Sequence, residues 1–335
     1  MFGLRSRVRV DEIWYENYYP EVKEQGLSPA EHYLKTGRRK GYFPTVKKLC
    51  RHYLKKGSFP WRDFLRFYGG MFHFPGLPEP DYLSVAAIVR NEACYIKEWI
   101  EYHRLAGVSR FYIYDNESED NLREVLQPYV DEGLVVLTDF PGRWRQIPAY
   151  NDALRRCRYK TRWLALIDAD EFLVPVRDED LICFLKKYEK YPGVVVNWVL
   201  YDSGGHKDRP EGLVIENYRT VHGTDHPRDH NVKSVVNPRR VKLCGSPHYC
   251  SYRRGCAVNE NFEQVRGPST AERSIAKIRL NHYFSKSYDE YLAKVSRGRI
   301  SSLGQYRLNR EDYLFPDAVE DYVMEKYAAL LRSKV

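Results

Sequence analysis

Residues 164–176 read LALIDADEFLVPV, in which Asp168, Asp170 and Glu171 interrupt an otherwise apolar run. Together with the two residues before it, the run predicts one buried strand over residues 162–176. Burying carboxylates costs free energy unless positive or hydrogen-bonding groups meet them. We therefore expect this strand to reach a polar site where cations lie close to its acids.

The chain before this strand alternates between strand-like and helix-like patterns. Strands are expected at 82–89, 110–116 and 134–140, and helices at 91–107, 121–133 and 147–161. Strands that alternate with helices at this spacing predict an α/β fold, with a mostly parallel sheet and helices on both of its faces.

Polar residues follow the first two of the expected strands and lie at the end of the fourth. They are RNE at 90–92, DNESED at 115–120 and DADE at 168–171. Open sheets of this kind bind ligands beyond the carboxyl ends of their strands, so we expect these residues to meet at one edge. Two carboxylates in an Asp-x-Asp pattern suit Mg²⁺ or Mn²⁺ bridging a diphosphate, because both cations prefer hard oxygen ligands.

Six longer motifs occur in order along the chain. They are AAIVRNEACYIKEWIEYHRLAGVSRFYIYDNESED, YNDAL, WLALIDADEFL, YDSGGHKDRPEGLVIENY, VKSVVNP and NHYFSKSYDEYLAKVSRG. Together they resemble glycosyltransferase family 92 and its bacterial family 2-like relatives, over residues 82–300. The resemblance implies a GT-A fold, the Rossmann-like fold of nucleotide-diphospho-sugar transferases, and a UDP-sugar donor.

The resemblance also implies roles for individual residues. Those expected to bind the nucleotide and its ribose are Arg90, Asn91, Glu92, Asp115, Asn116 and Asp168. Asp170 is expected to bind the metal, Mn²⁺ or Mg²⁺, and His282 to complete metal and diphosphate binding. Taken alone, Asp115 and the residues after it would also suit a solvated turn, and His282 would suit a packing role.

Three cations are candidates to neutralise the departing diphosphate. Lys233, Lys286 and Arg239 are considered because a positive group stabilises the negative charge that develops on a leaving group. Only Lys233 and Lys286 lie inside the family-like motifs. For each of the three, a solvated surface charge is the alternative.

An inverting transfer also needs a base that takes the proton of the acceptor hydroxyl. In similar enzymes this acid often follows a glycine-rich loop, which points to Glu216. The relatives read like FGSSGH where this chain reads YDSGGH, so Asp202 replaces a glycine and is the second candidate. Glu216 would alternatively begin a helix and benefit from its dipole.

Three regions are expected along the chain, namely a helical module with a linker at 1–78, the transferase domain at 79–300 and a helical tail at 301–335. In the first region, Ser28 and Pro29 are typical of a helix start and Gly37 of a helix end. The proline-rich stretch FPGLPEPD at 74–81 is typical of a linker. We expect no catalytic group before it.

The composition favours an anionic partner. A net charge of +9 and a pI of about 9.0 suit a nucleotide diphosphate, a phospholipid surface or a nucleic acid, and charge alone does not choose among them. The lysines and arginines are scattered, so no nucleic-acid partner is expected. The chain has no apolar run of roughly 20 residues and does not begin like a secretory signal. We expect a cytoplasmic protein, with peripheral contact at the inner face of a membrane.

The seven cysteines form no close Cys-x-x-Cys pair, which favours reduced thiols over a disulfide framework. Cys244, Cys250 and Cys256, with His248 among them, are spaced unlike the usual ligands of zinc, so no zinc site is expected.

The Asp-x-Asp pattern, together with what the resemblance implies, leads us to expect a metal-dependent, inverting glycosyltransferase. It would move a sugar from a UDP-sugar to a glycan or glycolipid acceptor, such as a surface polysaccharide or a lipid-linked glycan. A nucleotidyltransferase or sugar-phosphate transferase would also use acids on an α/β sheet, but the usual glycine and lysine signature of those enzymes is missing from the sequence. A non-enzymatic polyanion-binding module would explain the positive charge alone.

Overall fold

The computed structural model describes residues 10, 12, 15, 19, 21–45, 48, 49, 52, 81–297 and 309–335. The chain divides into two compact units, Met1–Pro78 and Glu79–Val335. The expected linker lies outside the described residues, except for Asp81 at its end. The three-part division, with boundaries after residues 78 and 300, stays a prediction.

The first unit contains short helices packed around tyrosines. Helix α2 spans Glu21–Glu24, helix α3 spans Pro29–His32, and a π-helix, η1, continues over Tyr33–Gly37. Ser28 forms a capping box with Glu31, which confirms the predicted helix start. A Cβ at Gly37 would collide with the hydroxyl of Tyr15, so the packing requires glycine there.

The second unit begins with the predicted alternation of strands and helices. These elements are β1 (Asp81–Val89), α6 (Ala93–Leu105), β2 (Arg110–Asp115), α7 (Leu122–Asp131), β3 (Val135–Asp139), α8 (Gln146–Cys157) and β4 (Thr161–Leu166). The expected strands and helices before residue 162 are therefore confirmed, with their ends shifted by a few residues.

The chain after β4 is richer in strands. Its elements are β5 (Glu171–Pro175), α9 (Leu181–Lys186), β6 (Gly193–Leu200), α10 (Val214–Asn217), β7 (Thr220–His222), the 3-10 helix η3 (Pro227–His230), β8 (Val232–Val236), β9 (Val241–Cys244), β10 (Cys250–Tyr252), β11 (Ala257–Val258), β12 (Gln264–Val265), β13 (Ile278–His282), α11 (Tyr288–Arg297), the 3-10 helix η4 (Arg310–Asp312), β14 (Ala318–Glu320) and α12 (Glu325–Arg332).

The described strands form one sheet of ten, and two short strand pairs lie outside it. The order is β12-β11-β6-β8-β4-β1-β2-β3, with β13 beside β6 and β5 beside β13. Strands β4, β1, β2 and β3 are parallel, whereas β8 runs antiparallel between β4 and β6. The expected α/β class, with a mostly parallel sheet flanked by helices, is confirmed.

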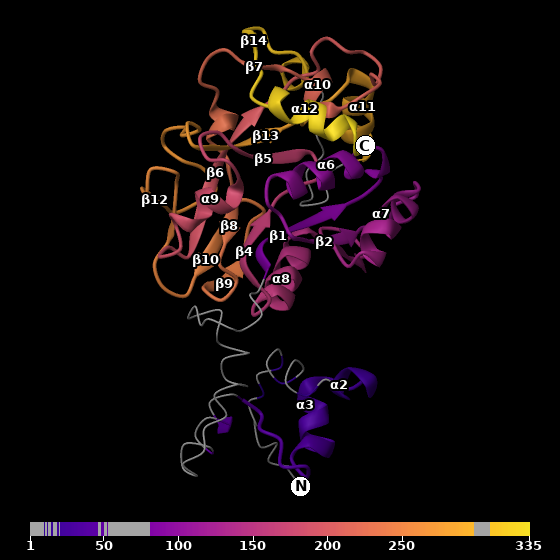
Figure 1. Ribbon diagram of the computed structural model, residues 1–335, viewed down its shortest axis with the longest axis vertical. Helices are drawn as coiled ribbons and strands as arrows, with labels where there is room; N and C mark the ends of the chain where they lie inside the picture. The colour runs from indigo at the N-terminus through magenta and orange to yellow at the C-terminus, as the bar shows by residue number, and fades with distance from the viewer. Residues whose placement is uncertain are drawn as a thin grey trace. The chain divides into compact units, whose positions relative to one another are not determined.

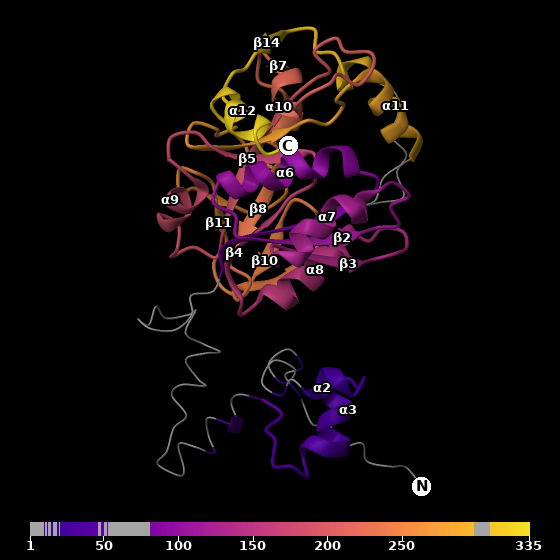
Figure 2. The same ribbon diagram turned by 45° about the vertical axis from the view of Figure 1, so that its right-hand side comes forward.

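The two faces of the sheet are covered by different helices. Along β1, Leu83, Val85 and Ala87 join the core beneath α6 and α7, whereas Ala86 and Ile88 join the core beneath α8. This alternation follows from the two-residue period of a strand. Figures 1 and 2 show α6 and α8 on opposite sides of β1 and β4.

The predicted single strand over 162–176 is wrong, because the chain turns at its acids. β4 ends at Leu166, and β5 begins at Glu171 and pairs antiparallel with β13. The turn between them brings the carboxylates of Asp168 and Asp170 to the edge of the sheet. A continuous strand would have directed neighbouring side chains alternately into the two apolar cores.

The C-terminal residues pack into the second unit. Phe315, Met324 and Leu331 belong to its main core, and the guanidinium of Arg279 forms an ion pair of 2.5 Å with Asp321. None of the described helices is both long and apolar enough to cross a membrane.

The expectation that the cysteines are reduced is wrong for one pair. Cys244 and Cys250 form a disulfide. They face each other in the β9–β10 hairpin, with their Cα atoms 4.1 Å apart. A spacing of six residues cannot be recognised as a hairpin without the pairing of the strands. Cys94, Cys157, Cys183 and Cys256 are free thiols.

Candidate active site

The acid at position 168 meets a lysine from the neighbouring antiparallel strand. The ammonium of Lys233 lies 2.8 Å from Oδ2 of Asp168, while Gln146 and Tyr150 donate to Oδ1 over 2.6 and 2.8 Å. Burial favours the neutral acid, but the charge of Lys233 holds the pKa of Asp168 below its usual value. Because β8 runs against β4, its first residues lie beside the last residues of β4.

The acid at position 170 meets a second lysine, from helix α11. The ammonium of Lys294 lies 2.5 Å from Oδ2 of Asp170, and Nε2 of His282 lies 3.6 Å from Oδ1. Burial again opposes ionisation, but Lys294 and His282 hold the pKa of Asp170 well below its usual range. Asp170 is therefore an anion at the end of the sheet.

The third acid, Glu171, lies beneath the other two and is fully buried. Its Oε2 accepts the backbone N–H of Asp168 over 2.8 Å and lies 3.4 Å from the ammonium of Lys233. Its Oε1 has no hydrogen-bond partner among the described residues, and neither has Nδ1 of His282, 4.0 Å away. Burial raises the pKa of Glu171 to about 8, against the attraction of Lys233. Lysines thus meet all three acids of the DADE stretch.

A third lysine reaches the same edge from the segment after β13. The ammonium of Lys286 lies 3.5 Å from the carboxylate of Glu92 and 4.0 Å from the ring centre of Tyr95. Burial lowers the pKa of Lys286, but Glu92 and Asp170 raise it above its usual value. Its φ of 52° is in the left-handed region, which a residue other than glycine adopts only where its surroundings hold it.

The residues predicted to bind the nucleotide lie after β1 and β2. Asn91 has a φ of 57°, and its side-chain oxygen accepts the backbone N–H of Glu119. The carboxylate of Asp115 accepts the backbone N–H of Ser118 over 3.0 Å. The contact of Asn91 joins the loop after β1 to the loop after β2, so these strand ends meet at one edge as expected.

Two other predicted residues of this region also contact the protein. Arg90 lies 3.4 Å from Glu119 on the surface. The amide of Asn116 is buried and donates to the carbonyls of Phe140 and Gly142, both over 2.9 Å. The amide of Asn116 therefore supports the loop after β3.

The two candidate bases have different surroundings. Asp202 is buried, and both of its oxygens accept hydrogen bonds, Oδ1 from Gly204 and Thr220 and Oδ2 from the backbone of Phe315. Glu216 is paired through Oε1 with Arg332 on α12. No described residue hydrogen-bonds its Oε2.

Arg239 lies at the wrong end of the sheet for the role considered from the sequence. It follows the last residue of β8, whereas Lys233 is near the first. Burial, and after it the positive charge of Arg162 at the start of β4, lower the pKa of Arg239 to about 10. An antiparallel strand carries its two ends to opposite edges, so Arg239 cannot accompany Lys233 to the site.

Sequence reasoning missed three residues that contact the acids. Lys294 lies within the motif NHYFSKSYDEYLAKVSRG, and Gln146 and Tyr150 lie at the start of α8. Tyr150 and Gln146 are four residues apart, so they share one face of the helix. That spacing was a usable signal, whereas nothing near Lys294 in the sequence points to Asp170.

A metal site is only partly formed by the side chains. In the described part of the chain, no group of three or more His, Cys, Asp or Glu side chains is arranged to hold a metal. Oδ1 of Asp170 and Nε2 of His282 nevertheless face each other at 3.6 Å. One carboxylate and one imidazole, completed by substrate phosphates, suit Mn²⁺ or Mg²⁺, which often use few protein ligands.

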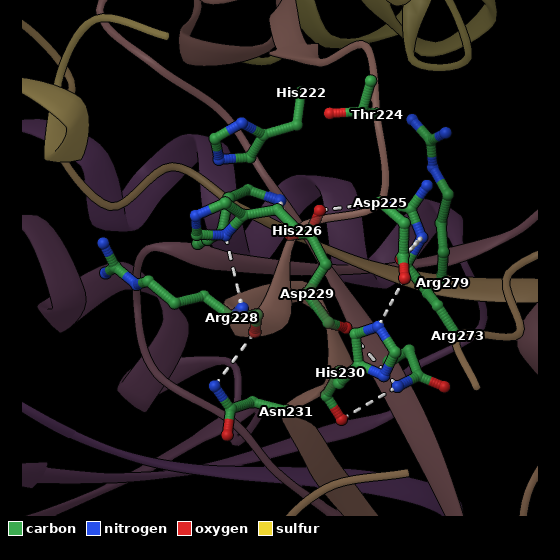
Figure 3. A network of polar contacts seen from close by, with 12 residues as sticks. His222, Thr224, Asp225, His226, Arg228, Asp229, His230, Asn231, Arg273 and Arg279 are labelled. Carbon is green, nitrogen blue, oxygen red and sulfur yellow. Dashed lines mark hydrogen bonds and ion pairs between the residues drawn. The ribbon is translucent and has the colours of Figure 1, made fainter. Parts of the chain in front are cut away.

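A second polar network occupies the loop between β7 and β8 (Figure 3). Asp229 is 1% exposed and accepts from Arg273 over 2.8 Å and from the backbone of Leu200 over 3.0 Å. His230 places one ring nitrogen 2.8 Å from Asp225 and the other 3.1 Å from the carbonyl of Thr270. Each carboxylate oxygen of Asp229 therefore meets a hydrogen-bond donor, and each ring nitrogen of His230 lies beside an acceptor oxygen.

Three curated relatives illustrate the similarity of this chain to known proteins. A glycosyltransferase family 92 protein of Arabidopsis thaliana is 26% identical over 64% of this chain and 37% of its own length. The galactan β-1,4-galactosyltransferase GALS3 of the same plant is 36% identical over 56% of this chain and 38% of its own length. The β-1,4-galactosyltransferase galt-1 of Caenorhabditis elegans is 33% identical over 64% and 51%. The chain spans about half or less of these relatives.

Solved structures show a weaker likeness. TarS of S. aureus is 13% identical over 47% of each chain, with a TM-score of 0.31. A glucosyl-3-phosphoglycerate synthase of Mycobacterium tuberculosis, solved with Mn²⁺, UDP and glucosyl-3-phosphoglycerate, is 17% identical over 38% of this chain and 50% of that one, with a TM-score of 0.25.

The family model of glycosyltransferase family 92 matches residues 82–302, which contain the six motifs and every lysine of the site. This match covers well over half of the chain and confirms the family expected from the motifs. The chain belongs to glycosyltransferase family 92.

Proposed function

We propose that the chain transfers a sugar from a UDP-sugar to a glycan or glycolipid acceptor, with inversion at the sugar carbon. Galactose is the first sugar to test, because two of the relatives are named as β-1,4-galactosyltransferases. The observation that supports this function best is that lysines from three separate segments meet Asp168, Asp170 and Glu92 at the edge where an open sheet binds ligands.

The lysines suit a diphosphate that leaves. Lys233 is buried, and the acids beside it hold its pKa well above the usual value in spite of that burial, so its ammonium stays charged. Lys286 is charged for the same reason. Fixed positive charges in a site of low water content stabilise a developing negative charge more strongly than they would in water.

Asp170 and His282 are the residues we propose for the metal, Mn²⁺ or Mg²⁺. Bound there, the cation would neutralise the diphosphate as the bond to the sugar weakens. Asp170 supplies an ionised carboxylate, and burial lowers the pKa of His282, which favours the neutral imidazole that binds metals.

The nucleotide would lie over the ends of β1 and β2. Arg90, Asn91, Glu92, Asp115 and Asn116 are the proposed contacts, with Asp168 at the ribose. Asp115 is 5% exposed and Asn116 is 4% exposed, so their first task is to hold the loops that would face the base.

We retain Glu216 as the proposed base and treat Asp202 as the rival. A base needs an oxygen that can reach the acceptor hydroxyl. Both oxygens of Asp202 are used within the fold, whereas Oε2 of Glu216 has no hydrogen-bond partner in the described chain. The glycan acceptor and peripheral contact with the inner face of a membrane stay proposals that rest on the family and on the positive charge.

The direct test is the release of UDP from a panel of UDP-sugars, UDP-galactose among them, with Mn²⁺, Mg²⁺ or a chelator. The expected result is release that depends on the metal and increases when a β-1,4-linked galactan oligosaccharide is added. A melting temperature that rises with UDP and Mn²⁺ together would support donor binding separately. No release from any donor, with or without metal, would refute the proposed function.

A further inference from the structure

The disulfide-closed hairpin β9–β10 presents one histidine beside the site. Its loop, residues 245–249, lies between Cys244 and Cys250, which are bonded to each other. The amide of Asn151, on α8, fixes the start of this loop by donating to the carbonyl of Cys244 over 2.8 Å and accepting its N–H over 3.0 Å. The loop is therefore held at its base by a covalent bond and by two hydrogen bonds.

The histidine in this loop, His248, is oriented by strand β8. Its carbonyl accepts from the hydroxyl of Ser234 over 3.0 Å, and its Nδ1 lies 3.1 Å from the carbonyl of Val232. These two residues flank Lys233, whose ammonium contacts Asp168. The imidazole is thus attached to the strand that supplies the first lysine of the site.

The contact with Val232 decides which ring nitrogen carries the proton. A carbonyl oxygen can only accept, so Nδ1 of His248 must donate. The proton therefore sits on Nδ1, and Nε2 has a lone pair. No described residue hydrogen-bonds Nε2. Burial and the charge of Lys233 lower the pKa of His248 to about 4, so the ring stays neutral near pH 7.

The ring lies on the side of the acids away from the loops proposed to bind the nucleotide. His248 packs edge-on against Trp198, with ring centres 5.1 Å apart, and Trp198 packs against His282, with ring centres 4.5 Å apart. In the sheet, the order β2-β1-β4-β8-β6 leads from the proposed nucleotide end, past the acids that follow β4, to the two strands that His248 contacts through Val232 and Trp198. A sugar attached to the diphosphate would point in this direction, and its acceptor would follow.

We propose that Nε2 of His248 accepts a hydrogen bond from a hydroxyl of the acceptor glycan and so positions that glycan. The inference rests on the proposed function and adds a residue of the acceptor site to it. A neutral imidazole with one fixed tautomer suits a hydroxyl, which can donate to it. The proton stays on the hydroxyl, so the role is binding and not proton transfer.

Two substitutions test the roles of the two ring nitrogens of His248 separately. In His248→Asn, the side-chain amide can still donate to Val232, but nothing replaces Nε2. In His248→Gln, the longer side chain carries an oxygen to about the place of Nε2. The matched control is Tyr249→Phe on the same loop, because no described residue hydrogen-bonds its hydroxyl.

The measurement is the KM and kcat of UDP-galactose transfer to a β-1,4-linked galactan oligosaccharide. His248→Asn is expected to raise the KM for the acceptor about tenfold, which corresponds to one lost hydrogen bond. His248→Gln should lie between this variant and the wild type, and Tyr249→Phe should match the wild type. The KM for the donor should change much less than the KM for the acceptor.

Other outcomes would overturn the inference. An unchanged acceptor KM in His248→Asn, or a fall in kcat without a change in KM, would exclude this role of His248. Transfer by the wild type would still support the proposed function in that case. If the variants do not fold, ¹⁵N spectra of the wild type replace them. The Nε2 resonance of His248 should then shift when the oligosaccharide is added, and an unmoved resonance refutes the role. No transfer and no UDP release by the wild type would refute both proposals.

Discussion

Two groups of buried acids in this chain differ in how completely their hydrogen-bonding atoms are used. In the β7–β8 loop, both oxygens of Asp229 have partners, and so have both ring nitrogens of His230. At the end of β4, Oε1 of Glu171 and Nδ1 of His282 have none among the described residues. Buried polar groups normally find partners, so atoms left without one are expected where a ligand or water completes the site. We infer that the first group maintains the fold, and we propose that the second binds a substrate.

The same distinction, between an acid with an unused oxygen and an acid without one, applies to the two candidate bases and gives the sharpest test. Glu216→Gln is expected to slow transfer about 10²–10⁴-fold, the usual contribution of a general base, with the affinity for UDP kept. Asp202→Asn should mainly lower stability, because its carboxylate holds Gly204, Thr220 and Phe315. Transfer rates, UDP binding and unfolding in urea would be measured for both variants.

The opposite pattern would assign the chemistry to the other acid. If Asp202→Asn abolishes transfer at normal stability while Glu216→Gln only lowers the melting temperature, the glycine-rich loop contains the base.

A second test removes one charge at the site. Asp170→Asn is expected to lower transfer by about 10²–10³-fold, the typical effect of losing one preorganised electrostatic group. The fold should survive, since asparagine has the same shape and Lys294 can still donate to its oxygen. Transfer at several Mn²⁺ concentrations and the circular dichroism spectrum provide the measurement. Wild-type activity with the same metal dependence would exclude Asp170 from the site.

A third test addresses the network that maintains the fold. Asp229→Asn is expected to cost about 3 kcal/mol of unfolding free energy, because Arg273 would lose its buried charge partner. The matched control is Asp225→Asn on the same loop. The side chain of Asp225 is 63% exposed, so this substitution should cost much less stability. Urea denaturation measures both. Equal effects of the two substitutions would contradict the assignment of this network to stability.

The smallest expected effect is a pH dependence. The hydrogen bond to Asp225 raises the pKa of His230 above its usual value. Because the pKa of His230 is raised in the folded state, its pairing with Asp225 stabilises the fold. This stabilisation is complete below the ordinary histidine pKa of about 6.5 and is lost as the pH rises through the folded pKa. The unfolding free energy should fall over that range, and more steeply in the wild type than in Asp225→Asn. Identical slopes in the two proteins would show that this pair does not contribute.

The sequence predicted the alternating elements of the sheet well, because their periodicity is local. The strand at 82–89, the helix that ends near Gly107 and the capped start at Ser28 all depend on residues within one turn or one strand. The break between β4 and β5 was missed, because an apolar run does not show where a strand leaves its neighbour. The disulfide was missed for a related reason, since it depends on the pairing of β9 with β10.

The sequence by itself determined which side chains stand at the ends of β1 and β2, because a residue's place in its own strand follows from its neighbours. Only the tertiary structure decided which side chains of the site meet. Lys233 and Asp168 are 65 residues apart, and Lys294 and Asp170 are 124 residues apart. Such contacts depend on strand order, direction and helix packing, which are set by burial over the whole unit. For the same reason Arg239, close to Lys233 in sequence, lies at the other end of β8.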